Sequence, residues 1–502
     1  RIFLILPEKR KSFSFLYIEI SRNKKYYTGV IFMETSLFEK VLATVDDWVW
    51  GVPLIVLIMA TGILLTLRMR GLNVRHLGLA LKYMVKNEEG GSGEVSSFGA
   101  LCTALSATIG TGNIVGVATA IAAGGPGALF WMIVAAFLGL ATKYTEGFLA
   151  IKYRTIDEDN HVLGGPFYYI ENGMGKNWKW LACVFAFFGV CVGLFGIGTF
   201  TQINGISSAV NNFFDPNNQW LTVIAGVQVS WTVVIAGLLV TLFVAMVVLG
   251  GIKRIASVSQ IIVPFMAVLY ILFALLIVGF NITKVPEALR EIVVGAFNPK
   301  AVTGGVVGSM FVAMQKGVAR GIFSNESGLG SAPIAAAAAK TKDTVRQGLV
   351  SMTGTFIDTI IICTMTGLAI VISGAWKNPD LQGVQITMEA FRTCLPFPAW
   401  VSSFVLMLCL VFFAFTTILG WDYYSERCLE YLSGRNMTAV KVYRWLYILA
   451  VFIGPYMTVS AVWTIADIFN GLMAFPNVIA LIALSGVVAK ETRDYFKSKK
   501  NM

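Results

Sequence analysis

The stretch Ser106-Ala-Thr-Ile-Gly-Thr-Gly-Asn-Ile-Val-Gly116, SATIGTGNIVG, lies in the middle of an apolar segment, residues 99–121. The segment is long enough to cross a bilayer, which takes roughly 20 residues. Gly110, Gly112 and Asn113 predict a break in the helix at mid-membrane depth. Unpaired backbone groups are expensive there, so a break is tolerated only where protein or a water-filled cavity covers it. We therefore expect a binding site at this position.

The composition predicts a membrane protein with many spans. The chain has 502 residues, of which 56% are hydrophobic and 13% are charged, whereas about a quarter of a soluble chain is charged. The net charge of +11 is explained by basic loops on one side of the membrane. We therefore expect the lipid bilayer as a partner and no nucleic acid.

The hydropathy pattern predicts eleven spans. The first covers 48–67, and ten follow at 99–121, 126–150, 180–210, 230–250, 256–280, 303–338, 348–373, 397–423, 444–456 and 459–489. Lys and Arg are concentrated in alternate loops, which places the N-terminus outside and the C-terminus in the cytoplasm.

The domain organisation follows from these spans. Residues 1–32 are basic and lack a convincing cleavage site, so we expect a non-native or disordered leader. Residues 33–98 would hold an amphipathic segment, the extra span and a cytoplasmic linker. The remaining units are a first five-helix repeat, an external helix, a second five-helix repeat and a cytoplasmic tail, at 99–281, 282–302, 303–490 and 491–502.

A second Gly-rich polar interruption occurs five spans after the first. The span 303–338 contains Asn325-Glu-Ser-Gly-Leu-Gly330. Interrupted spans at corresponding positions of two halves are typical of inverted-repeat transporters. The alternative is that the glycines only allow close helix packing, for which Gly112 and Gly116 have suitable spacing. The polar residues Asn113, Asn325 and Glu326 favour a functional site.

Two opposed breaks suit a small zwitterion. Half-helix N-termini attract a carboxylate, and exposed carbonyls attract Na⁺ or an ammonium group. We expect Thr111, Gly112 and Asn113 to donate to the carboxylate. Carbonyls of 323–325, with Glu326, would face the ammonium group. The side chains expected to line the pocket are those of Phe200, Gln202, Phe323, Asn325 and Trp421.

The coupling ion needs oxygen ligands, which Thr416 and Thr417 offer in the span 397–423. The alternative is that each hydroxyl bonds its own helix. Other polar residues at membrane depth are expected to pair structurally or to lie at span ends. These are Lys316, Arg320, Asp358, Asp422 and Asp467, and Asn204 lies at the same depth.

Two strings resemble a known family. GALCTALSATIGTGNIVGVATAIAAGGPGALFWM (99–132) and NESGLGSAPIAAAAAKT (325–341) are similar to the alanine or glycine:cation symporters, also called sodium:alanine symporters. The resemblance implies a LeuT-like fold of ten core helices in two inverted repeats, plus a leading helix. It also implies a Na⁺ site formed by the carbonyls of Ser106, Ile109 and Phe413 and the hydroxyls of Thr416 and Thr417. Glu326 departs from the LeuT-like pattern, so it would position the unwound backbone.

The sequence thus predicts an all-α symporter in a prokaryotic inner membrane. The resemblance implies that it carries alanine or glycine with Na⁺, and we expect it to work by alternating access as a monomer without an organic cofactor. The alternatives are a proton-coupled or differently specific carrier, with Glu326 or Asp358 as proton carrier, and an ion channel. An enzyme is disfavoured because the sequence has no HExxH, no GxSxG and only two histidines, both in loops.

Overall fold

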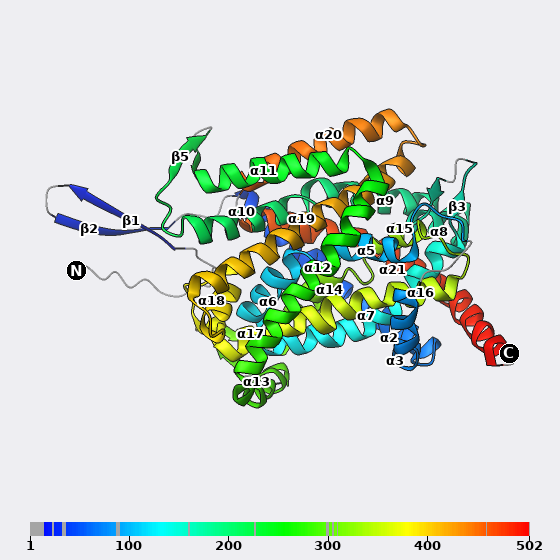
Figure 1. The fold of residues 1–502 in the computed structure, drawn as a ribbon, viewed down its shortest axis with the longest axis horizontal. Coiled ribbons are helices and arrows are strands. Elements are labelled where there is room, and N and C mark those ends of the chain that lie inside the picture. The colour runs from blue at the N-terminus through cyan, green and yellow to red at the C-terminus, as the bar shows by residue number, and fades with distance from the viewer. Residues whose placement is uncertain are drawn as a thin grey trace.

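The computed structural model describes residues 15–22, 25–32, 37–86, 91–158, 161–224, 227–297, 301–303, 306–308, 310–457 and 459–500. The long helices form one bundle, with the hairpin β1–β2 (Phe15–Arg22, Lys25–Phe32) extending from one end and the last turns of α21 (Val459–Lys500) from the other (Figure 1). The expected all-α class holds, with short hairpins added.

The leading helix is longer than the predicted span 48–67. It consists of α1 (Leu37–Val49) and α2 (Val52–Arg68), separated at 50–51, just before Pro53. It packs against α21 and against α7 (Gly127–Lys152). At Gly62, an added Cβ would lie only 2.9 Å from the Leu138 Cβ, so the glycine allows α2 to approach α7 closely.

The first half of the bundle contains the expected break. α5 (Ser97–Thr108) is followed by the π-helix η1 (Gly112–Gly116) and α6 (Val117–Gly124), with a bend of 50° between the two halves. After α7 come α9 (Lys179–Phe195), α10 (Phe200–Phe214), α11 (Trp231–Val248) and α12 (Gly251–Phe280).

The span predicted over 180–210 lies within the candidate span Lys176–Phe214, but its helix is interrupted between α9 and α10 at 196–199, which was not predicted. Backbone crowding explains the break. A Cβ on Gly198 would lie 2.6 Å from the Gly193 carbonyl oxygen, so only glycine fits.

The second half begins with α13 (Val285–Phe297), which lies within the predicted external helix 282–302. The next span is broken into α14 (Met310–Asn325) and α15 (Ala332–Ala337). The span after it is α16 (Thr344–Thr355), the π-helix η5 (Phe356–Cys363) and α17 (Thr364–Ser373). The last long helices are α19 (Ala399–Leu432), α20 (Met437–Ile453) and α21.

Two elements of this half were not predicted. The amphipathic helix α18 (Val384–Cys394) buries one face against α17 and α19. The predicted tail 491–502 is helical as far as Lys500, because α21 continues without interruption.

Short elements complete the fold. They are α3 (Leu72–Arg75), α4 (Leu77–Val85), α8 (Pro166–Tyr169), η2 (Ile170–Met174), and the hairpins β3–β4 (Thr155–Ile156, Val162–Leu163), β5–β6 (Leu221–Ile224, Val227–Ser230) and β7–β8 (Ala301–Thr303, Val306–Gly308). Within the predicted leader, residues 15–22 and 25–32 pair as antiparallel strands. Residues 1–14 and 23–24 lie outside the described residues, and a non-native origin stays a prediction.

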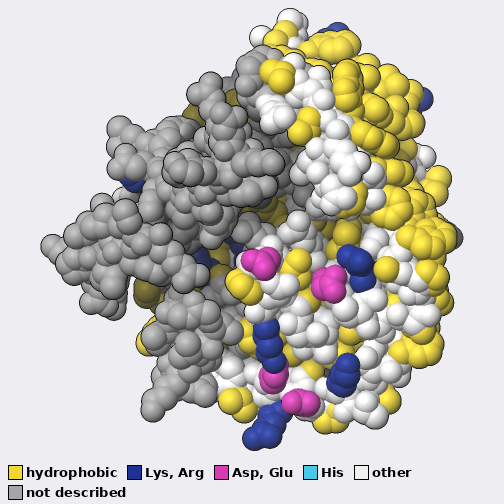
Figure 2. Space-filling view, turned by 90° about the vertical axis from the view of Figure 1, so that its left-hand side faces the viewer, with side chains coloured by type: hydrophobic (Ala, Val, Ile, Leu, Met, Phe, Trp, Pro, Cys, Tyr) yellow, Lys and Arg dark blue, Asp and Glu magenta, His cyan; other side chains and the backbone are white. Residues whose placement is uncertain are grey.

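The described residues contain nine helices that are long and apolar enough to span a membrane, or ten if the bent pair α5–α6 is one span. The eleven-span count is therefore not confirmed. The pair α14–α15 is not among these candidate spans, because the two helices have only 16 and 6 residues and residues 326–331 separate them. Figure 2 looks onto one end of the bundle, where acidic and basic side chains lie among small and polar ones, with hydrophobic side chains along the edge.

Candidate functional site

The first break lies at 109–111, where side chains from other helices replace helical hydrogen bonds. The Gly110 amide donates to Asn113 Oδ1 at 2.9 Å, and the Thr111 amide donates to Gln202 Oε1 at 3.0 Å. The Ile109 carbonyl accepts from the Thr417 hydroxyl at 3.2 Å. The break thus meets the requirement that buried backbone groups be paired.

The glycines of this break allow close contact as well as bending. A Cβ on Gly110 would lie 2.5 Å from Thr417 Oγ1, and one on Gly112 would lie 3.1 Å from the Ser324 Cα. Gly116 has nothing within 4 Å of such a Cβ. The packing alternative therefore accounts for Gly110 and Gly112, through contacts with α19 and α14, but not for Gly116.

The second break is centred on Glu326, whose φ of 57° is left-handed. Its carboxylate accepts from the Trp421 indole at 2.9 Å and from the Ser331 hydroxyl at 2.5 Å. Both oxygens thus hold protein partners. The expectation that Glu326 faces a substrate ammonium group is not supported, and its contacts fit the backbone-positioning role.

Asn325 has a similar bracing role. Its Nδ2 donates to the Thr359 hydroxyl at 3.1 Å, and its Oδ1 accepts from the Ser327 amide at 2.9 Å. It therefore links the second break to η5.

Glu146 and Asn477 hold the same break from α7 and α21. Glu146 Oε1 accepts from the Gly328 amide at 3.1 Å and from Asn477 Nδ2 at 2.8 Å, and Asn477 Nδ2 also donates to the Gly328 carbonyl at 2.9 Å. Sequence reasoning missed both residues. An ionisable residue inside an apolar span is itself a signal of function, and Glu146 carries that signal.

Asp358 connects the two breaks. Its carboxylate accepts from Asn113 Nδ2 at 2.7 Å, from the Ser324 hydroxyl at 2.9 Å and from the Thr359 hydroxyl at 2.6 Å. It lies in η5, and π-helical turns are frequent at functional sites. The sequence placed Asp358 among residues expected to pair structurally or to lie at span ends, with a proton carrier as the alternative, and in the structure it lies between the two breaks.

Four of the five predicted ion-site residues converge. Phe413 presents its carbonyl to the hydroxyls of Thr417 at 2.9 Å and Thr416 at 3.0 Å, and Thr417 also reaches the Ile109 carbonyl. Thr416 bonds its own helix through the Phe412 carbonyl as well, as the alternative predicted. The Ser106 hydroxyl donates to the Thr103 carbonyl at 2.7 Å, and a role for the Ser106 carbonyl stays a prediction.

The aromatic residues divide between two places. Phe323 is fully buried and lies next to Gly112, with its Cδ1 3.4 Å from the position of an added Cβ. Trp421 is bound to Glu326 and braces the second break. Phe200, at the start of α10, instead packs in a separate cluster with Ala450 of α20 and Val462 of α21. Its predicted pocket role is therefore not supported.

One end of the site is closed by an ion pair and a ring stack. Arg320 donates to both carboxylate oxygens of Asp467 at 2.8 and 2.7 Å. Its guanidinium lies over the rings of Phe323 and Trp463, which stack at 5.0 Å. Beyond this layer is an open cavity of about 530 Å³, lined in part by Thr119 and Trp376.

The other end is closed where the segment 91–95 meets the chain after α15. Arg154 donates to the carbonyls of Ser92 at 2.8 Å, Ala339 at 2.7 Å and Thr341 at 2.5 Å, and to that of Ala337. Glu94 and Arg427 form a salt bridge at 3.2 Å beside this contact. With both ends closed, the residues around the breaks are almost fully buried.

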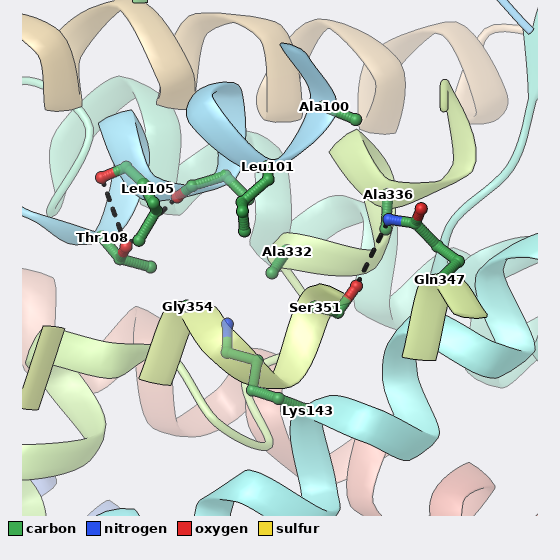
Figure 3. A pocket seen from close by; sticks show the side chains of 11 residues that line it. Ala100, Leu101, Leu105, Thr108, Lys143, Ala332, Ala336, Gln347, Ser351 and Gly354 are labelled. Carbon is green, nitrogen blue, oxygen red and sulfur yellow. Dashed lines mark hydrogen bonds between the residues drawn. The ribbon is translucent and has the colours of Figure 1, made fainter. Parts of the chain in front are cut away.

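Lys143 lies beside the breaks and was also missed from the sequence. Its ammonium group lines a small cavity of about 20 Å³ between α5, α7, α15 and α16 (Figure 3). Among the described residues its nitrogen has no hydrogen-bond partner. Thr108 at the end of α5 and Ala332 at the start of α15 line the same cavity, so Lys143 lies close to both breaks.

The geometry resembles a site for transport rather than catalysis, and comparisons with known proteins agree. A model of the sodium:alanine symporter family matches residues 34–502. The chain is 53% identical to an uncharacterized transporter of Haemophilus influenzae, over 92% of this chain and 97% of that protein. It is 46% identical to the sodium/alanine symporter AgcS of Methanococcus maripaludis, over 92% and 98% of the two chains.

More distant proteins extend this picture. The chain is 37% identical to the probable sodium/glutamine symporter GlnT of Bacillus subtilis, over 93% of this chain and 92% of that protein. The crystal structure of MhsT in complex with L-phenylalanine matches with a TM-score of 0.50 at 13% identity, over 80% of this chain and 99% of that one. This last likeness shows a LeuT-like fold and nothing more. On the family match and the closely similar relatives, the chain is a multi-pass membrane transporter that belongs to the sodium:alanine symporter family.

Proposed function

We propose that the protein moves alanine or glycine into the cell together with Na⁺. The observation that carries this proposal is the convergence of the Ile109 and Phe413 carbonyls on the Thr417 hydroxyl, with Thr416 beside them. Carbonyl and hydroxyl oxygens next to a broken helix suit Na⁺. A bound Na⁺ would fix the end of α5 against α19 and so prepare the neighbouring break for substrate.

The amino acid is proposed to bind between the first break and α14. Gly112 offers backbone, and Thr111 offers a buried hydroxyl that has no partner among the described residues. Phe323 covers this space and favours a small side chain. The sodium/alanine symporter is more similar to this chain than the sodium/glutamine symporter is, at 46% against 37% identity, which also favours alanine.

Transport is proposed to proceed by alternating access. The Arg320–Asp467 pair would open one side, and the Arg154 contacts would open the other. By the distribution of basic loops, the Arg320 side faces out and the Arg154 side faces the cytoplasm of a prokaryotic cell. The proposal includes two inverted five-helix repeats and a protein that works as a monomer.

Proton coupling through Asp358 is the second candidate. Asp358 is a buried carboxylate that contacts Asn113 of the first break and Ser324 beside the second. A proton on Asp358 would weaken these contacts, which gives a route from protonation to helix movement.

The deciding experiment is uptake of radiolabelled alanine into proteoliposomes under an imposed Na⁺ gradient or an imposed proton gradient. Uptake driven by Na⁺ that needs a higher Na⁺ concentration in Thr417→Ala than in the wild type supports the proposal. Thr353→Ala is the control, because Thr353 is equally buried and bonds only the Val350 carbonyl of its own helix. Uptake that follows the proton gradient alone and is lost in Asp358→Asn would replace Na⁺ by H⁺.

A further inference from the structure

A basic cavity lies where the leading helix and the C-terminal helix leave the bundle. It has a volume of about 330 Å³ and is lined by the chain after α2, by α3 and by the last turns of α21. Its charged lining residues are Arg70, Arg75, Arg493, Lys497 and Lys499, and no Asp or Glu lines it. The cavity is separate from the two breaks and has no part in the transport steps described above.

Most of the basic side chains that line this cavity form no ion pair with the described residues. Among the described residues, Arg70, Arg75, Arg493 and Lys497 form no ion pair, and all four are exposed. Lys499 donates to the hydroxyls of Tyr83 and Tyr495. At the same end, Arg427 and Arg444 do have acidic partners, in Glu94 and Glu426. An anion is therefore the missing partner of this surface.

The walls between the charges are apolar and fixed. His76 stacks on Phe496 at a centroid distance of 4.1 Å, and Met69 and Leu72 are buried below. Burial, and to a smaller extent Arg75, lowers the pKa of His76. The ring is therefore uncharged at neutral pH and serves as a wall. Apolar walls with a basic rim suit an amphiphile better than a free ion.

The position of the cavity matches the bilayer interface. The spanning helix ends at Arg68, directly before the cavity begins, and Leu67 remains 71% exposed on its outer face. Val74 of α3 is 58% exposed in the same region. Lipid phosphates lie at this level, and acyl chains run along the apolar face below it.

We propose that this basic cavity binds the phosphate headgroup of an anionic phospholipid. The lipid would join the leading helix to α21, which also supplies Asn477 to the second break. Basic pockets between spanning helices commonly bind anionic headgroups. The proposal rests on the placement of these helices in a bilayer and not on the coupling ion, so the two can fail separately.

The test is binding to the purified full-length protein in detergent, followed by native mass spectrometry and by thermal unfolding. The probes are phosphatidylglycerol, cardiolipin, phosphatidylcholine and inorganic phosphate. We expect retention and stabilisation with the two anionic lipids only. The triple variant Arg75→Gln, Arg493→Gln, Lys497→Gln should weaken anionic-lipid binding on the order of a hundredfold, since each surface cation contributes about a fivefold factor.

The matched control removes the same charge from the same end. It is Lys176→Gln, Lys342→Gln, Lys441→Gln, three exposed residues outside the cavity. Equal loss in both triple variants would overturn the proposal, because it would show a diffuse charge effect. Equal stabilisation by inorganic phosphate would assign the cavity to a free anion. If the triple variant does not fold, Arg75→Gln with Lys497→Gln gives the same comparison, with an expected loss on the order of thirtyfold.

Discussion

The two breaks differ in what holds them. At the first break, neutral groups pair with the backbone: Asn113, Gln202 and Thr417 each satisfy one group. At the second, the carboxylates of Glu326 and Glu146 accept hydrogen bonds from α19, α21 and the break itself. Charge-assisted hydrogen bonds are roughly twice as strong as neutral ones.

This difference suggests that one break exchanges its hydrogen-bond partners during transport while the other keeps them. Gln202 and Thr417 are easily exchanged for an ion or a substrate, because neither contacts a buried carboxylate, whereas Asn113 is also bound to Asp358. The second break is held by buried charges whose loss costs more. We therefore expect the first break to change partners during transport and the second to stay braced.

Glu326→Ala should have the largest effect. It leaves the Trp421 indole and the Ser331 hydroxyl buried without an acceptor, at about 1–3 kcal/mol each. We expect uptake to fall more than a hundredfold and the protein to unfold at a lower temperature. Glu326→Gln keeps an oxygen for Trp421 and should retain more activity. Full uptake activity in Glu326→Ala would contradict the inference that the second break depends on buried carboxylates.

Thr417→Ala should act on the ion and leave the fold intact. We expect the Na⁺ concentration for half-maximal uptake to rise about tenfold, equivalent to about 1.4 kcal/mol. Thr416→Ala should change it less, because only Thr417 reaches the Ile109 carbonyl. Sodium titrations of alanine uptake measure both. Equal effects would place the ion midway between the two hydroxyls.

Arg154→Gln should open one end of the bundle. It removes donors from four carbonyls that tie the segment 91–95 to the chain after α15. The amide hydrogens of Val95 and Lys340 bond across this contact and should exchange several times faster in hydrogen–deuterium exchange. Hydrogen exchange in α14, which leads into the second break, should not change. Unchanged exchange at Val95 would show that the salt bridge between Arg427 and Glu94 is enough to keep this end closed.

A pH effect at the same closure should be smallest. Hydrogen bonds to the carboxylates of Glu430 and Glu94 raise the pKa of His161 to about 9, and burial and Arg427 oppose them. Because the folded pKa exceeds the ordinary 6.5, the stabilisation is full below about pH 6.5 and disappears as the pH rises through about 9.

The magnitude is about 1 kcal/mol, since the ring is partly exposed and solvent screens the pair. The difference in unfolding temperature between the wild type and His161→Gln, measured from pH 6 to 10, should shrink with rising pH. A difference in unfolding temperature that does not change with pH would mean that His161 stabilises the fold by packing and not by its charge.

Both breaks, most of the spans and the family could be predicted from the sequence, because each depends on local pattern. Glycine next to asparagine or glutamate inside an apolar run marks a break wherever the chain folds. Apolar length marks a span in the same way. The break at 196–199 was missed, because neither Gly196 nor Gly198 is next to an asparagine or a charged residue.

What the sequence by itself determined is where the membrane helices lie and where they are interrupted. Only the tertiary structure decided the partners: Asn113 meets Asp358 across 245 residues, and Glu146 meets Asn477 across 331. It also moved Phe200 away from the site and brought Lys143 to it. The physical reason is that hydropathy fixes a residue's depth in the bilayer, whereas helix packing and rotation decide which side chains face each other at that depth.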